Sequence, residues 1–429
     1  MTFAESMAFI QSFSKSGVPV RDLSRIRTLL DELGAPEKKL QFVHIAGTNG
    51  KGSTLAFSSA AAIQAGFRTG QFTSPYMVRY NDRIRINGQD ISDERLAVLC
   101  TKVASCNVAA ECSQFEVTFA IALLYFAEEK CDLVFLEAGV GGLLDATNVI
   151  ESPLVSVITS ISPDHTALLG KTIPEITAQK AGIIKTGCPV IVAADNPESV
   201  VEQIEQAALE KSAPLRIPEF RDCRILKENL TGTCFQYHSM NYCLKMPGRH
   251  QISNAITAIE IIRTLSMHGY LISAQNVADA FQQVQVPARI QQIGEKPTVL
   301  LDGSHNQASV LALADVLRNA DCDSVILICG MLKSKDYRTA SRILAQTADF
   351  VICADDFAQD AVPSSELAEC FSEYCSVRQL PLAEALPFAK KLAAGKNSII
   401  AVCGSLYLAS FYLNDLSNYM PIHDDIFPL

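Results

Sequence analysis

A glycine-rich stretch near the N-terminus has the residue types that phosphate chemistry needs. The sequence HIAGTNGKGST spans residues 44–54, between the apolar run 42–46 and the helix-compatible run 55–65. Glycines let backbone N–H groups converge on phosphate oxygens, and the dipole at a helix N-terminus favours an anion. Lys51 would place a point charge beside the terminal phosphates of a nucleotide. We therefore predict a nucleotide-binding loop that contains Gly47, Thr48, Asn49, Gly50, Lys51, Gly52 and Ser53.

This loop departs from the strict P-loop pattern G-x-x-x-x-G-K-[ST]. The first glycine of that pattern would fall at Ile45, and Gly52 follows the lysine. A glycine-rich turn can also do no more than connect a strand to a helix. The strand–turn–helix context favours nucleotide binding over that simpler interpretation.

Acidic residues and histidines follow two apolar runs that read as strands. The run 132–137 ends at Glu137, and the run 155–160 is followed by Asp164 and His165. Mg²⁺ bridges protein oxygens and substrate phosphates, so a carboxylate at a strand end beside a phosphate loop is suited to hold it. The hydroxyl of Ser74, in Thr-Ser-Pro, could provide another ligand. Each residue alone could equally be a solvated strand end or part of a turn, but candidates at consecutive strand ends favour a site.

Two later segments add candidates whose chemistry depends on context. Lys180 lies in a helical stretch downstream of His165, where a lysine is usually on the surface. Asp302 and His305 follow the apolar run 298–301, although an Asp-Gly turn would explain this pattern equally well.

The strands and helices that must position these residues can be predicted from the pattern of apolar residues along the chain. Short β-branched runs alternate with longer helical stretches, which indicates βαβ units and a parallel sheet. We predict an α/β protein with two domains, a larger P-loop-type parallel-sheet domain and a smaller Rossmann-like C-terminal domain. The predicted limits are 1–285, a linker at 286–297 rich in proline and polar residues, and 298–429. Residues 215–245 read as short strands at an antiparallel edge of the first domain. The predicted strand runs are 42–46, 133–137, 155–160, 190–194, 299–302, 325–329, 350–354 and 399–402.

Composition excludes several classes of protein. The chain has 429 residues with 36 Lys and Arg against 46 Asp and Glu, a formal net charge of -10, and such an acidic chain is a poor default binder of nucleic acid. The longest apolar run, 119–127, is too short to cross a bilayer, and the first residues lack the basic start of a signal peptide. The 14 cysteines include no C-x-x-C pair, so we expect them to be reduced and buried. We expect a cytoplasmic monomer with no nucleic-acid or membrane partner.

Considered together, the segments resemble the folylpolyglutamate synthase/dihydrofolate synthase family, within the Mur-type ATP-dependent amide ligases. The similarity covers nearly the whole chain in order, and the stretch from Glu137 to Lys180 is the most specific. The matching blocks are 44–54, 73–75 with 82–92, 115–118, 136–148, 158–176, 179–190, 247–255, 287–293, 301–306, 334–336 and 404–410.

The resemblance implies an ATP- and Mg²⁺-dependent ligase that joins L-glutamate to dihydropteroate, to tetrahydrofolate, or to both, through an acyl phosphate. It implies catalytic roles for Lys51, His165 and Lys180, the last as a carbamate that helps to hold metal. Mg²⁺ ligands would be Ser74, Glu137 and His165. The nucleotide would also contact Asn254, Arg289, Asp302 and His305 from the far side, so the site should close between the domains. The dihydropteroate pocket would include Ser113, Gln114, Phe115, Glu116, Leu144, Asp145 and Ala146.

Some positions depart from the family pattern. Leu143 stands where the family has arginine, Tyr76 where it usually has histidine, and Gln179 where it usually has glutamate. Leu143 lies beside the pocket segment and removes a charge, so it bears on substrate choice more than on catalysis. Two other hypotheses are a Mur-type ligase acting on another carboxylate, such as a nucleotide-linked peptidoglycan precursor, and a non-catalytic nucleotide-binding protein.

Overall fold

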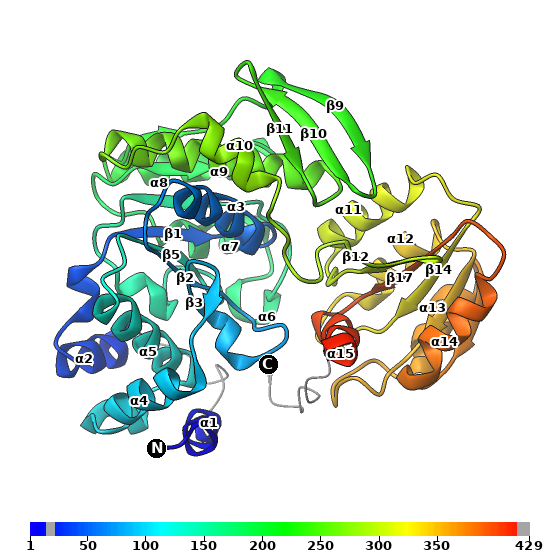
Figure 1. Cartoon of the computed structure of the whole chain (residues 1–429), viewed down its shortest axis with the longest axis horizontal. Helices are drawn as coiled ribbons and strands as arrows, with labels where there is room; N and C mark the ends of the chain where they lie inside the picture. Colours follow the sequence, from blue (N-terminus) through cyan, green and yellow to red (C-terminus); the bar gives the residue numbers. More distant parts are fainter. Residues whose placement is uncertain (14–21, 418–429) are drawn as a thin grey trace.

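The structure is a computed structural model that describes residues 1–13 and 22–417. Figure 1 shows two sheet-centred domains side by side, with a small antiparallel sheet above their junction. The prediction of an α/β protein with a larger parallel-sheet domain and a smaller C-terminal one is confirmed. Within the described ranges, no helix combines the length and the apolar character needed to cross a membrane.

The first sheet has eight strands in the order β4-β3-β2-β5-β1-β6-β7-β8. Strand β1 pairs in parallel with β5 on one side and with β6 on the other. Ile45 of β1 therefore lies opposite Glu137 of β5, and Ala46 lies opposite Ile158 of β6. The carboxyl ends of these three strands therefore meet at one edge, which is where parallel sheets bind ligands. The strands are β1 (Phe42–Ala46), β2 (Thr69–Phe72), β3 (Ile84–Ile86), β4 (Gln89–Asp90), β5 (Leu133–Glu137), β6 (Val155–Ile158), β7 (Val190–Val192) and β8 (Leu215–Arg216).

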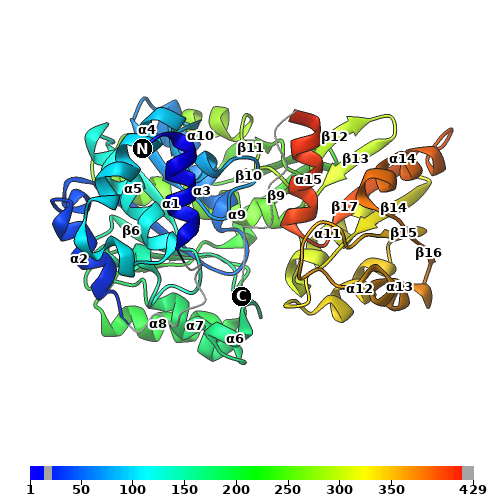
Figure 2. The same cartoon turned by 90° about the horizontal axis from the view of Figure 1, so that it is seen from below.

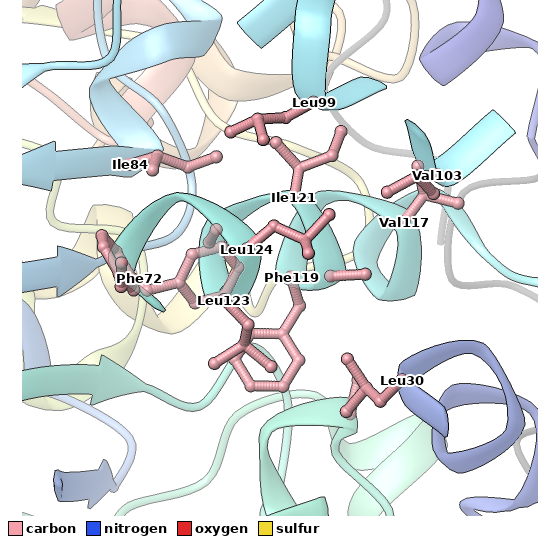
Figure 3. Close-up of a cluster of buried hydrophobic side chains, with 14 of the residues drawn as sticks. Leu30, Phe72, Ile84, Leu99, Val103, Val117, Phe119, Ile121, Leu123 and Leu124 are labelled. Carbon is pink, nitrogen blue, oxygen red and sulfur yellow. The ribbon is translucent and has the colours of Figure 1, made fainter. Parts of the chain in front are cut away.

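Helices cover both faces of this sheet, which is why every residue of β1 and β5 is buried. One face packs against α3 (Lys51–Gln64), α9 (Arg249–Met267) and α10 (Ala274–Phe281). The other packs against α5 (Gln114–Glu128), whose apolar residues meet Phe72, Leu30 and Leu99 in the cluster of Figure 3. The remaining α-helices of this domain are α1 (Phe3–Ser12), α2 (Ser24–Glu32), α4 (Asp93–Ala104), α6 (Thr166–Leu169), α7 (Ile173–Ala181) and α8 (Glu198–Glu210).

Strands β9 (Cys223–Asn229), β10 (Gly232–Tyr237) and β11 (Met240–Leu244) form a separate antiparallel sheet. The prediction of antiparallel strands here is right, but they do not extend the edge of the first sheet. Cys234 and Cys243 lie directly opposite each other on β10 and β11 and form a disulfide. The expectation that all cysteines are reduced is therefore wrong for this pair, because β pairing brings together two residues that sequence spacing does not link. Of the free cysteines, Cys100, Cys112, Cys131, Cys329, Cys353 and Cys403 are buried and the other described ones are half-buried.

The second domain is built on a six-stranded sheet in the order β12-β13-β17-β14-β15-β16. Strand β12 (Gln291–Glu295) pairs antiparallel with β13 (Thr298–Leu301), so the stretch predicted as a linker at 286–297 contains an edge strand. Its prolines and glycine flank and interrupt that strand, as edge strands tolerate. The other strands are β14 (Ser324–Cys329), β15 (Phe350–Cys353), β16 (Ser376–Gln379) and β17 (Ser398–Cys403).

Five helices flank this second sheet. Figure 2 shows α15 on the side of the second domain that faces the first. The helices are α11 (Gln307–Arg318), α12 (Tyr337–Ala345), α13 (Ser364–Ser372), α14 (Leu382–Leu392) and α15 (Leu406–Ser417).

Candidate active site

The predicted phosphate loop connects β1 to α3 at the carboxyl edge of the first sheet. Gly50 adopts a φ of 87°, and a Cβ there would lie 2.3 Å from Asn254 Oδ1. A Cβ at Gly47 would lie 1.8 Å from Thr159 Oγ1. Both positions accept only glycine, because a side chain would collide with α9 or with the end of β6. The absence of side chains at these two positions lets the loop backbone lie directly against Asn254 and Thr159.

Lys51 begins α3 and folds back over the loop. Its Nζ donates to the carbonyl oxygens of Gly47 and Thr48, each at 3.2 Å, and lies 3.9 Å from Glu137 Oε1. The ammonium thus lies between the loop backbone and a buried carboxylate. A phosphate bound at the loop would compete with these carbonyl oxygens for the Lys51 ammonium. Because the phosphate is negatively charged, its hydrogen bond to the lysine would be the stronger one.

Glu137 ends β5 and faces the loop and the Thr-Ser-Pro segment. Its side chain accepts a hydrogen bond from the Ser74 backbone N–H at 3.4 Å and is almost fully buried. Burial raises the pKa of Glu137, and the nearby Lys51 and Arg289 charges oppose that shift. A cation beside this carboxylate would favour its ionised form.

His165 precedes α6 in a left-handed backbone conformation with a φ of 47°. Burial lowers its pKa to about 4, and the Lys335 charge adds to the effect. The imidazole is therefore neutral at pH 7, the form in which a histidine nitrogen can accept a proton or bind a metal.

Lys180 lies beneath the phosphate loop and not on the surface. It projects from α7, is only 3% exposed, and its Nζ donates to the Gly47 carbonyl at 2.8 Å. Burial lowers the pKa of Lys180 to about 7, with a further contribution from Lys51. A substantial fraction of this amine is therefore neutral near pH 7.

The predicted residues of the second domain line the junction between the domains. Asp302, at the end of β13, accepts hydrogen bonds from the backbone N–H of Ile290 at 3.0 Å and of Ser304 at 2.9 Å. It thereby fixes the segment that carries Arg289, whose charge reaches Glu137 across the junction. His305 contacts the Gly303 carbonyl through Nδ1 at 2.7 Å.

Polar side chains join the phosphate loop directly to the second domain. Asn49 and Asn306 exchange side-chain hydrogen bonds at 3.3 and 3.1 Å. Asp164 accepts from Lys335 Nζ at 2.6 Å, and His305 Nε2 lies 3.5 Å from it. Asn306 and Lys335 were not among the predicted site residues, although both lie in the blocks 301–306 and 334–336 that carried the family resemblance.

Burial alone would raise the pKa of Asp164. The hydrogen bond from His305 and the Lys335 charge instead hold that pKa well below its usual range. Asp164 is therefore an anion at neutral pH, and its positively charged partner belongs to the other domain.

The residues predicted for the dihydropteroate pocket divide into two groups. Ser113 and Glu116 form a capping box at the start of α5, with Ser113 N–H donating to Glu116 Oε2 at 2.7 Å and Glu116 N–H donating to Ser113 Oγ at 3.3 Å. Phe115 instead packs over Gly139, where a Cβ would lie 2.9 Å from its ring. Asp145 accepts from the Val140 N–H at 3.0 Å and so orders the same segment.

The other members of that set differ in exposure. Leu144 is exposed beside Leu143, Ala146 is buried, and Gln114 is half-buried. Phe115 thus packs against the loop that follows β5, and Asp145 and the two leucines belong to that loop. The capping residues Ser113 and Glu116 have a structural role that accounts for them without a ligand.

Comparison with known proteins follows the same division of the chain. A Mur ligase middle domain matches residues 45–262, and a Mur ligase glutamate ligase domain matches residues 288–406. The dihydrofolate synthase/folylpolyglutamate synthase of Bacillus subtilis is 34% identical, in an alignment that covers 95% of this chain and 97% of the relative. The chain belongs to this family. The folylpolyglutamate synthase of Lacticaseibacillus casei is 32% identical, with 96% of this chain and 97% of that one covered.

Solved structures of family members have the same fold. E. coli FolC in complex with DHPP and ADP superposes with a TM-score of 0.85 at 26% identity, covering 97% of this chain and 98% of the other. Mycobacterium tuberculosis folylpolyglutamate synthase complexed with ADP has a TM-score of 0.85 at 28% identity, covering 98% and 99%. The two-domain arrangement and the family resemblance are both confirmed.

Proposed function

We propose that this protein is an ATP- and Mg²⁺-dependent ligase that adds L-glutamate to dihydropteroate, giving dihydrofolate, and to tetrahydrofolate, giving polyglutamates. The observation that carries the proposal is the convergence of Lys51, Glu137 and Lys180 on one phosphate loop. The Bacillus subtilis relative has both activities in its name, which supports a bifunctional enzyme. We further propose that the protein acts as a monomer in the cytoplasm.

The proposed chemistry begins with two anions that repel each other. The substrate carboxylate attacks the γ-phosphorus of ATP, ADP leaves, and an acyl phosphate forms. The amine of L-glutamate then attacks the acyl carbon, and inorganic phosphate and a proton are released as the amide forms. Lys51, which begins α3 and folds back over the loop, and the loop N–H groups would stabilise charge on the transferring phosphoryl group.

The side chains proposed for Mg²⁺ fit that ion. Glu137 would supply a buried carboxylate and His165 a neutral imidazole, and Ser74, whose backbone N–H donates to Glu137, would supply its hydroxyl. Among the described residues, no group of three His, Cys, Asp or Glu side chains could hold a metal ion. Mg²⁺ does not need such a group, since it usually keeps several waters and binds one or two carboxylates plus substrate phosphates. When bound, it would neutralise charge on the phosphate oxygens.

Carbamylation of Lys180 is supported by its surroundings. The reaction joins a neutral amine nitrogen to the carbon of CO₂ and releases one proton, so it requires the uncharged lysine. A pKa of about 7 makes that form available at neutral pH. The carbamate would place an anion beneath the loop, and that negative charge would favour a metal ion there.

The remaining predicted residues have proposed roles at the junction and the pocket. Asn254 and Arg289 would contact the nucleotide from the far side, and Asp302 would keep Arg289 in place. Phe115 and Asp145 would contact the pterin ring beside Gly139.

The test is ADP release by the purified protein with Mg²⁺ and ATP, with and without L-glutamate. Dihydropteroate, tetrahydrofolate and a nucleotide-linked peptidoglycan precursor are compared as carboxylate substrates. We expect glutamate-dependent ADP release with the first two. Release with the peptidoglycan precursor alone would support the other Mur-type ligase. ATP binding without glutamate-dependent release from any substrate would support a non-catalytic protein.

A further inference from the structure

Asp164 lies where the two domains meet, on the loop between β6 and α6. Its side chain is 9% exposed, and its carboxylate accepts hydrogen bonds from Lys335 Nζ at 2.6 Å and Asn306 Nδ2 at 3.1 Å. His305 Nε2 lies 3.5 Å away. These three side chains belong to the second domain, and the His165 backbone N–H of the first domain also donates to Asp164 at 2.8 Å. Within residues 1–13 and 22–417, the ion pairs that cross between the domains both end on Asp164.

The contact continues from Asp164 into the phosphate loop. Asn306 bonds to Asp164 and also exchanges hydrogen bonds with Asn49, whose amide donates to Ser162 Oγ at 3.3 Å. Asn306 Oδ1 also accepts the Ser309 N–H at 3.0 Å and so caps α11. Because the Asn306 side-chain amide is fixed to α11, any movement of the second domain would carry it away from Asn49 and Asp164.

Two other contacts between the domains involve only uncharged groups. Ser410 on α15 donates to the Met77 carbonyl, and Leu230, at the turn between β9 and β10, packs against the core of the second domain. Separation of these two contacts would leave a neutral hydroxyl or a leucine without its partner, but no uncompensated charge. A carboxylate that is nine-tenths buried loses much more, because separation leaves an uncompensated charge. The Asp164 contact is therefore more sensitive than these two contacts to a change in the relative position of the domains.

We propose that the Asp164–Lys335 pair sets the closure of the second domain over the phosphate loop, with both residues acting as positioning residues. The inference rests on the proposed ligase function. When the pair is formed, Asn49 stays within hydrogen-bond distance of Asn306, and His305 stays beside Asp164. When it is broken, the groups on either side of the site separate, and the reacting atoms lose their alignment.

The test compares Asp164→Asn, Lys335→Met and the double variant with the wild-type protein. Lys333→Met is the matched control, because Lys333 is exposed and lies two residues from Lys335. We measure the radius of gyration by small-angle X-ray scattering with a non-hydrolysable ATP analogue and Mg²⁺. Glutamate-dependent kcat/KM is measured in parallel, and circular dichroism reports folding.

We expect each single variant to expand in scattering and to lose on the order of 10- to 100-fold in kcat/KM for glutamate. The double variant should be no worse than the more impaired single variant, because both changes break the same contact. Lys333→Met should match wild type in both measurements. If Asp164→Asn does not fold, Lys335→Met carries the test.

An unchanged radius of gyration in folded Lys335→Met, or losses in kcat/KM that add independently in the double variant, would overturn the proposal. Scattering needs no turnover, so it separates this inference from the proposed function. A wild-type protein that turns over no substrate, with variants that still expand, would refute the ligase function and leave the positioning contact standing.

Discussion

At the scale of single residues, the candidate site depends on how burial changes ordinary side chains. Lys51 and Glu137 could be predicted from sequence because each follows a strand beside a glycine-rich turn. Lys180 could be assigned a role only through the family resemblance. Its position under Gly47 arises from the packing of α7, and a helical lysine has no local sequence signal for burial.

Lys51→Met should lower kcat for glutamate-dependent ADP release on the order of 10²–10³-fold, because it removes the charge beside the transferring phosphoryl group. Steady-state kinetics with saturating ATP check this expectation. Lys171→Met, a change at an exposed lysine, serves as the control and should keep wild-type kinetics. Wild-type turnover in Lys51→Met would refute the assignment of the phosphate loop.

Lys180→Ala should be nearly inactive, and added acetate or another short carboxylic acid should restore part of the activity. The acid would supply the anion that we assign to the carbamate. Intact-mass measurement in bicarbonate buffer tests the modification itself, with Lys180→Ala as the unmodifiable reference. Full activity of Lys180→Ala without an added acid would exclude the carbamate role.

At the scale of elements, most buried parallel strands could be predicted, but the two edge strands of the second domain's sheet could not. The runs 42–46 and 133–137 coincide with β1 and β5, because fully buried strands are continuous apolar sequences. Strands β12 and β16 were not predicted, since both are edge strands with polar or exposed residues. Their formation depends on a neighbouring strand that sequence periodicity does not reveal.

Strand β1 contains an element-level source of pH dependence. His44 is fully buried and its Nε2 lies 2.8 Å from Thr147 Oγ1, which in turn contacts Asp145. Burial lowers the pKa of His44 to about 3, with a further contribution from Lys185. In the unfolded chain a histidine titrates near 6.5, so below that pH the unfolded state binds a proton that the folded state does not. Stability should therefore fall as the pH falls from about 6.5 toward 3.

His44→Gln should reduce this dependence. Between pH 7.5 and pH 5, the free energy of unfolding should fall by about 2 kcal/mol less in the variant than in the wild type. Urea unfolding of both proteins at the two pH values gives these free energies. Subtracting the loss in the variant from the loss in the wild type cancels the contributions of the other titrating groups. Equal losses in the two proteins would show that His44 does not supply this dependence.

At the scale of the whole molecule, the site is completed where the two domains meet. A site between domains was expected from the family resemblance, but the side chains that hold the domains together were not. Asn49, Asp164 and Lys335 are far apart in the sequence, and only the packing of the domains brings them into one network. The Cys234–Cys243 disulfide and the separate sheet β9–β11 likewise depend on pairing that spacing alone does not predict.

Asp302→Ala should raise the KM for ATP on the order of tenfold, with a smaller effect on kcat. The buried carboxylate orders the segment that carries Arg289, so its loss weakens nucleotide binding before and during the reaction alike. Asp321→Ala, at an exposed position of the same domain, should leave both constants unchanged. A loss confined to kcat would assign Asp302 a catalytic role instead.

The most direct test of the central claim follows the oxygen atoms of the substrate carboxylate. Dihydropteroate labelled with ¹⁸O in its carboxylate is incubated with ATP, Mg²⁺, L-glutamate and the enzyme, and the phosphate is analysed by mass spectrometry. An acyl phosphate formed at the loop predicts one ¹⁸O in each released phosphate, together with dihydrofolate. Released phosphate without ¹⁸O, or phosphate release that does not depend on glutamate, would contradict the account.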